Sequence, residues 1–428
     1  MPKFRRKTIW IVAGTAVVTV AAMLLALNLS SGEKKIERRI ERLYALDDPR
    51  FAHELGVLLG PAFVAGNRIQ ALHNGEQIFP AMLAAIRGAQ TSITFETYIY
   101  WSGDIGREFA DALSDRARHG VKVHVLLDWV GSAKVEDSLI EEMTAAGVQI
   151  RKFHPPHWSH LGRFNNRTHR KLLVVDGRTG FTGGVGIAPQ WTGHAQDPEH
   201  WRDSHFQVEG PVVAQIQSVF IDNWIKVTGD VLHGPAYFAA LEPAGNARAQ
   251  VFSSSPSGGS ESMQLMYLLA ITAATRTIDL AAAYFVPDEL VSRALVEAMQ
   301  RGVKLRIVVP GEHIDSETVR SASRARWGPL LAAGAVIAEY RPTMFHCKVM
   351  IVDALLVSVG STNFDNRSFR LNDEATLNIL DAAFAKEQTA VFAADLARSR
   401  PLSHAQWQAR PWQEKLKEQV ASLIGAQL

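Results

Sequence analysis

Two short segments of the chain carry the same sparse pattern of polar residues, His-x-Lys-x-x-x-x-Asp. The copies are His169, Lys171 and Asp176, and His346, Lys348 and Asp353. The four positions between Lys and Asp are apolar in both copies, as expected of a buried strand, and period-two geometry places His and Lys on one face. A single copy would most simply be an accidental histidine on a core strand. Two copies with identical spacing make that explanation weak.

A histidine and a lysine at this spacing suit phosphoryl chemistry. One imidazole can attack phosphorus near neutral pH and form a covalent intermediate. The other can protonate the departing alkoxide and then deprotonate the incoming alcohol. Two lysines can neutralise phosphoryl charge where a metal ion would otherwise act. The pattern lacks the clustered imidazoles and carboxylates of a zinc site, so we expect no metal and no other cofactor.

A segment of small residues follows each motif. Gly183 and Gly184 follow the first, and a Gly-Ser-Thr-Asn string containing Ser361 and Asn363 follows the second. Backbone without side chains allows a phosphate to approach closely. We therefore include Gly184, Ser361 and Asn363 among the supporting site residues.

The motifs occupy equivalent places in an internal repeat. A strand pattern in residues 92–100 returns in residues 277–288, and each copy leads through a helical segment to a basic residue and a glycine, Gly120 and Gly302. A buried-strand run and a second helix follow in both copies. This alternation predicts two α/β/α halves with largely parallel strand pairing. A pseudo-twofold axis would bring equivalent loops to one seam, with the boundary near residues 245–259.

The first 30 residues predict a transmembrane anchor. Basic residues up to Lys7 precede an uncharged run, Ile9 to Leu29, which as a helix would span about 31 Å, close to a bilayer core. A cleaved signal peptide is the alternative, but the apolar region is long and no small-x-small cleavage site follows it. A short basic tail usually stays inside, which favours an extracytoplasmic body, although basic residues on the two sides of the span nearly balance.

Three further segments have patterns of their own. Ile36, Ile40 and Leu43 have helical spacing and predict a juxtamembrane helix or spacer, with packing against the body as the alternative. The aromatic and basic insert at residues 154–167, absent from the second half, could lie at the level of lipid headgroups or be an ordinary packed loop. Near the C-terminus, an amphipathic helix is expected to dock on the body rather than on a membrane. Its apolar face comprises Leu416, Val420, Leu423, Ile424 and Leu428.

Composition limits the partners. The chain has 428 residues, of which 47% are hydrophobic and 21% charged, so it can pack as a globular protein and is not disordered throughout. Its net charge is only +2, so no global field favours a nucleic-acid partner. The single cysteine, Cys347, excludes an internal disulfide.

The paired motifs resemble the phospholipase D superfamily over about residues 60–400. More closely, the chain is similar to bacterial cardiolipin synthases with a single N-terminal span. The second half is the more specific, with strings at residues 343–348, 360–368 and 372–374, and the first half adds residues 201–205 and 209–211. One position departs from the repeat, because Gly186 stands where the second half has Asn363.

The resemblance implies roles for individual residues. It makes His169 the nucleophile and His346 the general acid and base. It also implies crossed partners that orient the imidazoles, Glu374 for His169 and Asp203 for His346. We expect Asp176 and Asp353 to stabilise their own motif loops rather than to touch substrate.

The same resemblance implies a cardiolipin synthase in the bacterial inner membrane. A phosphatidyl group would pass from one phosphatidylglycerol to a second, releasing glycerol, and no nucleic-acid partner is expected. Hydrolysis by a phospholipase D, a phosphodiester nuclease and a catalytically idle membrane-tethered binding protein are the alternatives. The oligomeric state is left open. The expected divisions are an anchor (1–30), a spacer (31–58), two halves (59–244 and 245–400) and a C-terminal amphipathic helix (401–428).

Overall fold

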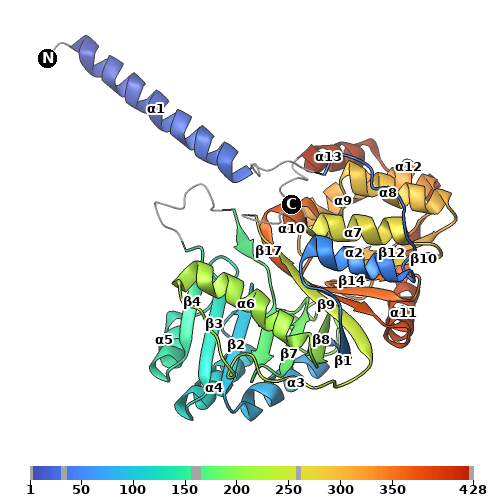
Figure 1. The fold of residues 1–428 in the computed structure, drawn as a ribbon. Coiled ribbons are helices and arrows are strands. Elements are labelled where there is room, and N and C mark those ends of the chain that lie inside the picture. Colours follow the sequence, from blue (N-terminus) through green and yellow to red (C-terminus); the bar gives the residue numbers. More distant parts are fainter. Residues whose placement is uncertain (1–2, 30–35, 156–164, 257–261, 424–428) are drawn as a thin grey trace.

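The computed structural model describes residues 3–29, 36–155, 165–256 and 262–423. These residues form two halves of like topology that join edge to edge, with 16 described strands in one sheet. Helices cover both faces of that sheet (Figure 1). The mixed α/β fold predicted from the sequence is therefore confirmed.

The two halves have the same order of strands. In the first half this order is β4-β3-β2-β6-β7-β8-β1, and in the second β13-β12-β10-β14-β15-β17-β9, with β18 added beyond β13. The first-half strands are β1 (Val64–His73), β2 (Ser92–Thr97), β3 (Lys122–Asp128), β4 (Gln149–Phe153), β6 (Leu172–Val175), β7 (Thr179–Gly183) and β8 (Ser204–Glu209). Those of the second half are β9 (Ala247–Ser254), β10 (Thr277–Ala282), β12 (Lys304–Pro310), β13 (Val336–Tyr340), β14 (Lys348–Val352), β15 (Leu356–Gly360), β17 (Asn372–Leu380) and β18 (Ser399–Leu402). Short strands β5 (Arg167–Thr168), β11 (Phe285–Val286) and β16 (Phe364–Asp365) complete the set. The repeat in sequence is thus a repeat of topology.

The halves meet where β1 pairs with β9, its counterpart in the other half. The pairing is antiparallel, with Val64 opposite Ala249 and Asn67 opposite Ala247. Equivalent strands related by a twofold axis must run antiparallel, so this seam has the geometry that a duplicated fold requires. The buried Asn67 amide donates to the carbonyl oxygens of Val64 (2.8 Å) and Ala247 (3.1 Å), which ties the seam together.

The expectation of largely parallel pairing was wrong. Among the described strands of the main sheet, β2-β3-β4 and β10-β12-β13 run parallel within their halves, and the short strand β5 pairs in parallel with β17 across the halves. From β6 to β8 and from β14 to β17, neighbouring strands pair antiparallel. The reason is loop length: β6 and β7 are joined by a tight turn at residues 176–178, and parallel strands need a much longer crossover.

The helices form layers on the two faces of the sheet. They are α2 (Pro49–Leu59), α3 (Asn74–Gly88), α4 (Asp104–Arg118), α5 (Asp137–Ala145), α6 (Val213–Thr228), α7 (Ser262–Ala273), α8 (Glu289–Gln300), α9 (Glu317–Ala332), α10 (Asn366–Arg370), α11 (Ala382–Ala397), α12 (His404–Gln408) and α13 (Trp412–Leu423), with a short 3-10 helix, η2 (Pro189–Trp191). Helices α3 to α5 share a buried apolar core with one face of the first half, and α2, α7, α8 and α9 share one with the second. Helices α6 and α11 contribute to a third core that contains strands of both halves. This shared core fixes the relative position of the two halves.

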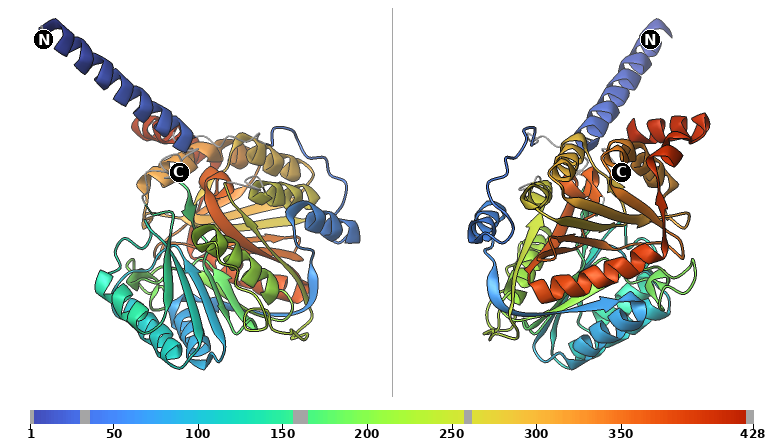
Figure 2. Two further views of the ribbon diagram at one scale, coloured as in Figure 1. Left: turned by 60° about the vertical axis from the view of Figure 1, so that its left-hand side comes forward. Right: turned by 90° about the vertical axis from the view of Figure 1, so that its right-hand side faces the viewer.

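The N-terminal helix α1 (Lys3–Leu29) projects away from the body, as both views in Figure 2 show. Its described side chains are exposed, among them Ile9, Trp10 and Ile11. In the described part of the chain, no helix combines the length and apolarity needed to cross a membrane. The transmembrane anchor expected from the sequence is therefore not found.

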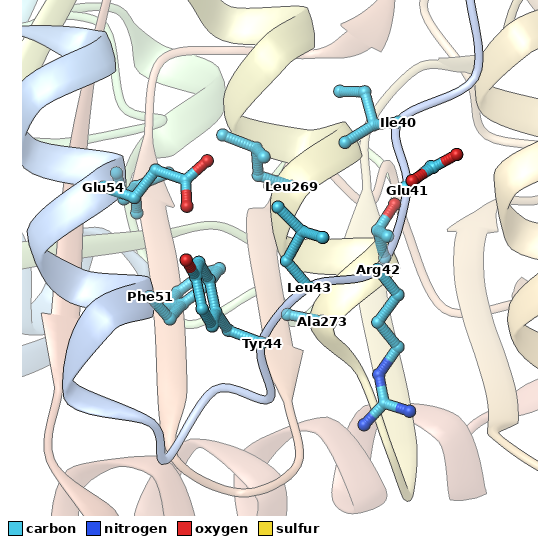
Figure 3. Close-up of a pocket in the computed structure, with 11 residues that line it drawn as sticks. Ile40, Glu41, Arg42, Leu43, Tyr44, Phe51, Glu54, Leu269 and Ala273 are labelled. Atoms are coloured by element: carbon cyan, nitrogen blue, oxygen red, sulfur yellow. The ribbon is translucent and has the colours of Figure 1, made fainter.

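Residues 36–46 do not form the juxtamembrane helix that the spacing of Ile36, Ile40 and Leu43 suggested. They run in a non-helical conformation along the second half, where Ile36, Ile40 and Tyr44 pack against its apolar core. Figure 3 shows Ile40, Leu43 and Tyr44 facing Leu269 of α7 and Phe51 of α2 around a cavity of about 140 Å³. The alternative, packing against the body, is correct for Ile36 and Ile40, which tertiary contacts partly bury, whereas Leu43 stays largely exposed.

Helix α13 docks on the body, but not by the predicted face. Glu418 and Ala421 are its buried residues, and the Glu418 carboxylate pairs with Arg410 (2.7 Å) and with Arg324 of α9 (3.4 Å). The apolar stripe formed by Trp412, Leu416, Val420 and Leu423 is exposed instead. Ile424 and Leu428 of the predicted face lie outside the described residues. Helix α13 therefore contacts the body through the ion pairs of Glu418 rather than through its apolar stripe.

Candidate active site

The two motifs meet because each is hydrogen-bonded to the opposite half. The His169 amide donates to the Asp373 carbonyl oxygen (2.9 Å), and the His346 amide donates to the Arg202 carbonyl oxygen (2.8 Å). Asp373 and Arg202 directly precede the two acids, Glu374 and Asp203. Both histidines lie just before the buried strands β6 and β14 rather than within them. The pseudo-twofold arrangement thus brings each imidazole to a carboxylate of the other half.

Each imidazole has one ring nitrogen engaged by that carboxylate. Nδ1 of His169 lies 3.0 and 3.1 Å from the two carboxylate oxygens of Glu374, and Nδ1 of His346 lies 2.7 Å from Oδ2 of Asp203. The crossed partners that the resemblance implied are therefore present. A carboxylate at Nδ1 favours the tautomer with its proton on Nδ1, which leaves Nε2 for the substrate.

Fixed donors in turn orient the two fully buried carboxylates. Glu374 accepts hydrogen bonds from the hydroxyl of Ser361 and from the amide of Asn372 (3.2 Å). Asp203 accepts from the indole N–H of Trp191 (3.0 Å) and from the backbone N–H of Ser204 (2.8 Å). Such support restricts the angle at which each imidazole faces the site.

Burial and neighbouring charge set the ionisation of these groups. Burial lowers the pKa of His169 to about 4, against the opposing effect of Glu374, and burial together with Lys348 lowers the pKa of His346. Burial alone would raise the pKa values of Glu374 and Asp203, but the histidines and lysines outweigh it and hold both pKa values below their usual range. The free site therefore pairs neutral imidazoles with ionised carboxylates, and a neutral imidazole is the nucleophilic form.

The two motif lysines lie beside their histidines. Nζ of Lys171 donates to the His169 carbonyl oxygen (2.8 Å), and Nζ of Lys348 donates to that of His346 (2.7 Å). Burial lowers the pKa of Lys171 to about 7 and also lowers the pKa of Lys348. A bound phosphate would raise the pKa values of both lysines and favour their charged forms, so the site is prepared for an anion.

The motif aspartates lie at the other end of the motif strands. Asp176 accepts hydrogen bonds from the backbone N–H groups of residues 90–92, and Asp353 accepts from those of residues 275–277. Both have a left-handed backbone, with φ of 54°. Neither lines the cavity that holds the histidines. Their hydrogen bonds hold the turn after each motif strand.

The small residues after the motifs divide into two kinds. A Cβ on Gly184 would lie 2.2 Å from Oδ1 of Asp203, so this glycine makes room for the carboxylate rather than for a phosphate. Ser361, its counterpart, donates to Glu374. Asn363 lines the cavity, and its buried Oδ1 has no hydrogen-bond partner among the described residues. Of Gly184, Ser361 and Asn363, only Asn363 lines this cavity.

A cavity of about 410 Å³ contains both histidines. Its wall includes residues to which the sequence analysis gave no role: Tyr98, Ile99, Trp101, Arg167, Gln190, Trp191, Trp201, Tyr284, Asp315, Asp365, Arg367 and Asn372. The rings of Trp191 and Trp201 lie 5.3 and 5.4 Å from that of His346, and the ring of Tyr98 lies 5.1 Å from that of His169. Trp201, Arg367 and Asn372 belong to the strings that carried the resemblance, which was the one available signal for them.

Two other expectations concern the surroundings of the cavity. Within the described residues, no group of three or more His, Cys, Asp or Glu side chains is arranged to hold a metal ion. The aromatic and basic insert falls largely on residues 156–164, outside the described part of the chain. Arg167, at its end, is described and lines the cavity.

Comparison with known proteins identifies the family. The sequence matches the family described as "Cardiolipin synthase, PLD-like domain" over residues 82–224 and 267–396. It is 34% identical over 362 residues to cardiolipin synthase A of Pseudomonas fluorescens (strain SBW25), covering 84% of this chain and 75% of that protein. It is 34% identical to the cardiolipin synthase of Geobacillus thermodenitrificans (strain NG80-2), covering 90% and 77%.

Solved structures extend the likeness of the fold. The crystal structure of phosphatidylserine synthase from Haemophilus influenzae Rd KW20 superposes with a TM-score of 0.68 at 14% identity, over 89% of this chain and 99% of that one. At that identity the likeness concerns the fold alone. From the sequence match and the two-motif site together, the chain belongs to the cardiolipin synthase family and is a phosphatidyltransferase of the phospholipase D superfamily.

Proposed function

We propose that the enzyme makes cardiolipin from two molecules of phosphatidylglycerol through a phosphohistidine on His169, with release of glycerol. The observation that carries this proposal is the composite site itself, in which two imidazoles with carboxylate-bound Nδ1 atoms share one cavity with a motif lysine. Two such imidazoles permit one to bond to phosphorus while the other moves protons.

In the first step, Nε2 of His169 attacks the phosphorus of the donor lipid. The P–N bond forms as the P–O bond to the headgroup glycerol breaks, and Nε2–H of His346 gives its proton to the departing alkoxide. The donor phosphate carries a negative charge that favours the protonated form of His346, as Asp203 does. Lys171 and Lys348 neutralise charge on the non-bridging oxygens.

In the second step, His346 takes the proton from a hydroxyl of the acceptor lipid. The acceptor oxygen then attacks phosphorus, the P–N bond breaks and His169 is restored. Water in place of the lipid alcohol would give phosphatidic acid, so hydrolysis is the competing outcome. Transfer prevails only when a lipid alcohol is held close and water is held back.

The reaction products decide between transfer and hydrolysis. With vesicles of phosphatidylglycerol, the full-length enzyme should yield cardiolipin and free glycerol in equal amounts, with phosphatidic acid a minor product, as measured by lipid mass spectrometry and a glycerol assay. Phosphatidic acid as the main product would overturn the synthase assignment and leave a phospholipase. His169→Ala, purified in parallel, controls for contaminating activity.

We further propose that the enzyme works at a membrane surface. This is supported by exposed apolar side chains on α1 and by the stripe Trp412, Leu416, Val420 and Leu423 on α13, since an exposed apolar helix face can insert at the acyl boundary. Deletion of residues 1–30 should reduce activity on vesicles or shift products toward phosphatidic acid. Replacing Leu416 and Val420 by Ser should reduce co-flotation with phosphatidylglycerol vesicles several-fold, whereas Gln413→Ser, on an exposed polar position, should not. Unchanged flotation of the stripe variant would exclude α13 from the contact.

A further inference from the structure

The cavity breaks the pseudo-twofold symmetry of the fold in its charge. Arg167 lies two residues before His169, and the equivalent position before His346 is Met344, which is buried. Arg367 lies seven residues after Gly360, and the equivalent position after Gly183 is Gln190. At each of these two equivalent positions, one half carries an arginine and the other half carries a neutral side chain.

The two arginines line the same cavity, together with His169. The charge of Arg367 acts on Arg167, and burial and that charge lower the pKa of Arg167 against the opposing effect of Asp128. Both also act on the phenol of Tyr98, which lies against His169. Two guanidinium groups near enough to repel each other in a partly buried wall favour an anion between or beside them.

Described neighbours position both arginines. Arg367 donates to the backbone and side-chain oxygens of Asn165 (3.3 and 3.1 Å), and the guanidinium of Arg167 lies 5.7 Å from the ring centre of Trp129. Burial raises the pKa of Asp128, the carboxylate that acts on Arg167, to about 6. That carboxylate is engaged by the backbone N–H groups of residues 130, 131 and 168.

The cavity wall also contains two carboxyl groups, and both are engaged locally. Asp315 accepts from the Tyr284 hydroxyl (2.8 and 2.7 Å). Asp365 accepts from the backbone N–H of Ser368 at the start of α10, and burial raises its pKa to about 7 against the opposing effect of Arg367. Trp101, Trp191, Trp201 and Gln190 also line the cavity and carry no charge. The two arginines therefore attract an anion in this cavity in addition to Lys171.

We propose that Arg167 and Arg367 bind the phosphodiester of the acceptor lipid, as a second anion site beside the phosphohistidine. This inference rests on the proposed function, because only transfer between two anionic lipids needs such a site. Lys171 and Lys348 serve the phosphate that reacts. The acceptor brings a second phosphate, three carbons away from its attacking hydroxyl, and the first phosphate would repel it unless separate cations hold it. Water and neutral alcohols need no such site.

Two reactions with different acceptors distinguish a defect in acceptor binding from a defect in the catalytic steps. Exchange of labelled glycerol into phosphatidylglycerol uses His169 and His346 with a neutral acceptor, whereas cardiolipin formation needs the anionic one. The double variant Arg167→Met/Arg367→Gln gives these positions the side chains found in the other half. We expect its rate of cardiolipin formation on phosphatidylglycerol vesicles to fall about 100-fold and its glycerol exchange to fall by no more than about 5-fold.

Two control variants test whether the positive charge at positions 167 and 367 is responsible for the loss. Arg118→Gln, an exposed arginine on α4, should change neither rate, and Arg167→Lys/Arg367→Lys should recover much of the lost cardiolipin formation because it keeps both charges. Equal loss of both reactions in the Met/Gln variant, or retention of both, would overturn the inference. Wild-type enzyme that exchanges glycerol but makes no cardiolipin would overturn the proposed function instead.

Discussion

The two halves of this enzyme share their strand order but not their contribution to the site. The first half supplies His169 and the second half supplies its partner Glu374, while His346 depends on Asp203 of the first half. Neither half contains the carboxylate partner of its own motif histidine. A duplicated fold has therefore produced one composite site rather than two.

The pairs also differ in geometry, which fits a division of roles. Glu374 faces His169 with both oxygens at 3.0 and 3.1 Å, whereas Asp203 makes a single contact of 2.7 Å with His346. The surroundings differ too, since two tryptophan rings lie against His346 and a tyrosine ring lies against His169. Equivalent positions in a repeat can thus keep their backbone and acquire different chemistry.

The largest expected loss of turnover comes from replacing one of the two histidines at a time. His169→Ala should lower turnover by 10³-fold or more and form no covalent intermediate, because no nucleophile remains. His346→Asn should still form the intermediate but resolve it slowly. Acid-free quenching with phosphatidylglycerol labelled in the phosphate should retain label on the His346 variant alone. Label on protein that lacks His169 would reverse the two roles.

Removing the charge of each carboxylate tests whether the two pairs act alike. Glu374→Gln and Asp203→Asn should each lower turnover by about 10² to 10⁴-fold, because each leaves its imidazole without the partner that fixes its tautomer. Rapid-quench measurements should assign the loss in Glu374→Gln to formation of the intermediate. In Asp203→Asn, resolution of the intermediate should be slowed as well, because His346 moves the proton in both steps. Identical partitioning in the two variants would contradict the division of roles.

The pH dependence should reveal the buried lysine of the first motif. Lys171 must be protonated to attract a phosphate, and burial lowers its pKa to about 7. The value of kcat/KM, which reports the free enzyme, should therefore fall about tenfold per pH unit above 7. Lys171→Arg should shift that alkaline limb upward, since a guanidinium stays charged there. An unshifted limb would assign the titration to another group. On the acid side, His169, with its pKa lowered to about 4, should remain nucleophilic at pH 5.

The smallest effect on chemistry should come from the motif aspartates, whose role is structural in both halves. Asp353→Asn and Asp176→Asn each disturb a carboxylate that accepts several backbone hydrogen bonds, at a cost of about 1–3 kcal/mol in the free energy of unfolding. The loss should be greater for Asp353, the more buried of the two. Thermal unfolding should show this order, and the ratio of cardiolipin to phosphatidic acid should stay constant. A changed product ratio would place these residues nearer to the substrate than the structure does.

Much of the site could be read from the sequence because the necessary information was local. The spacing of His, Lys and Asp around four apolar residues predicted a buried strand with a reactive end, and its repetition predicted two halves. The resemblance supplied Glu374 and Asp203 as partners, and the structure contains both contacts. Apolar periodicity likewise indicated the α/β class.

Only the tertiary structure decided how these pieces face one another. Strand direction depended on loop length, so β6 and β7 became antiparallel neighbours although the pattern suggested parallel ones. The apolar stripe of α13 became exposed because Glu418 found Arg410 and Arg324. The difference between Arg167 and Met344 became interpretable only because folding brings Arg167 and Arg367, 200 residues apart in sequence, to the lining of one cavity. Periodicity records which face of an element is apolar, whereas pairing, ion pairs and charge asymmetry depend on residues that are distant in sequence and adjacent only in the folded chain.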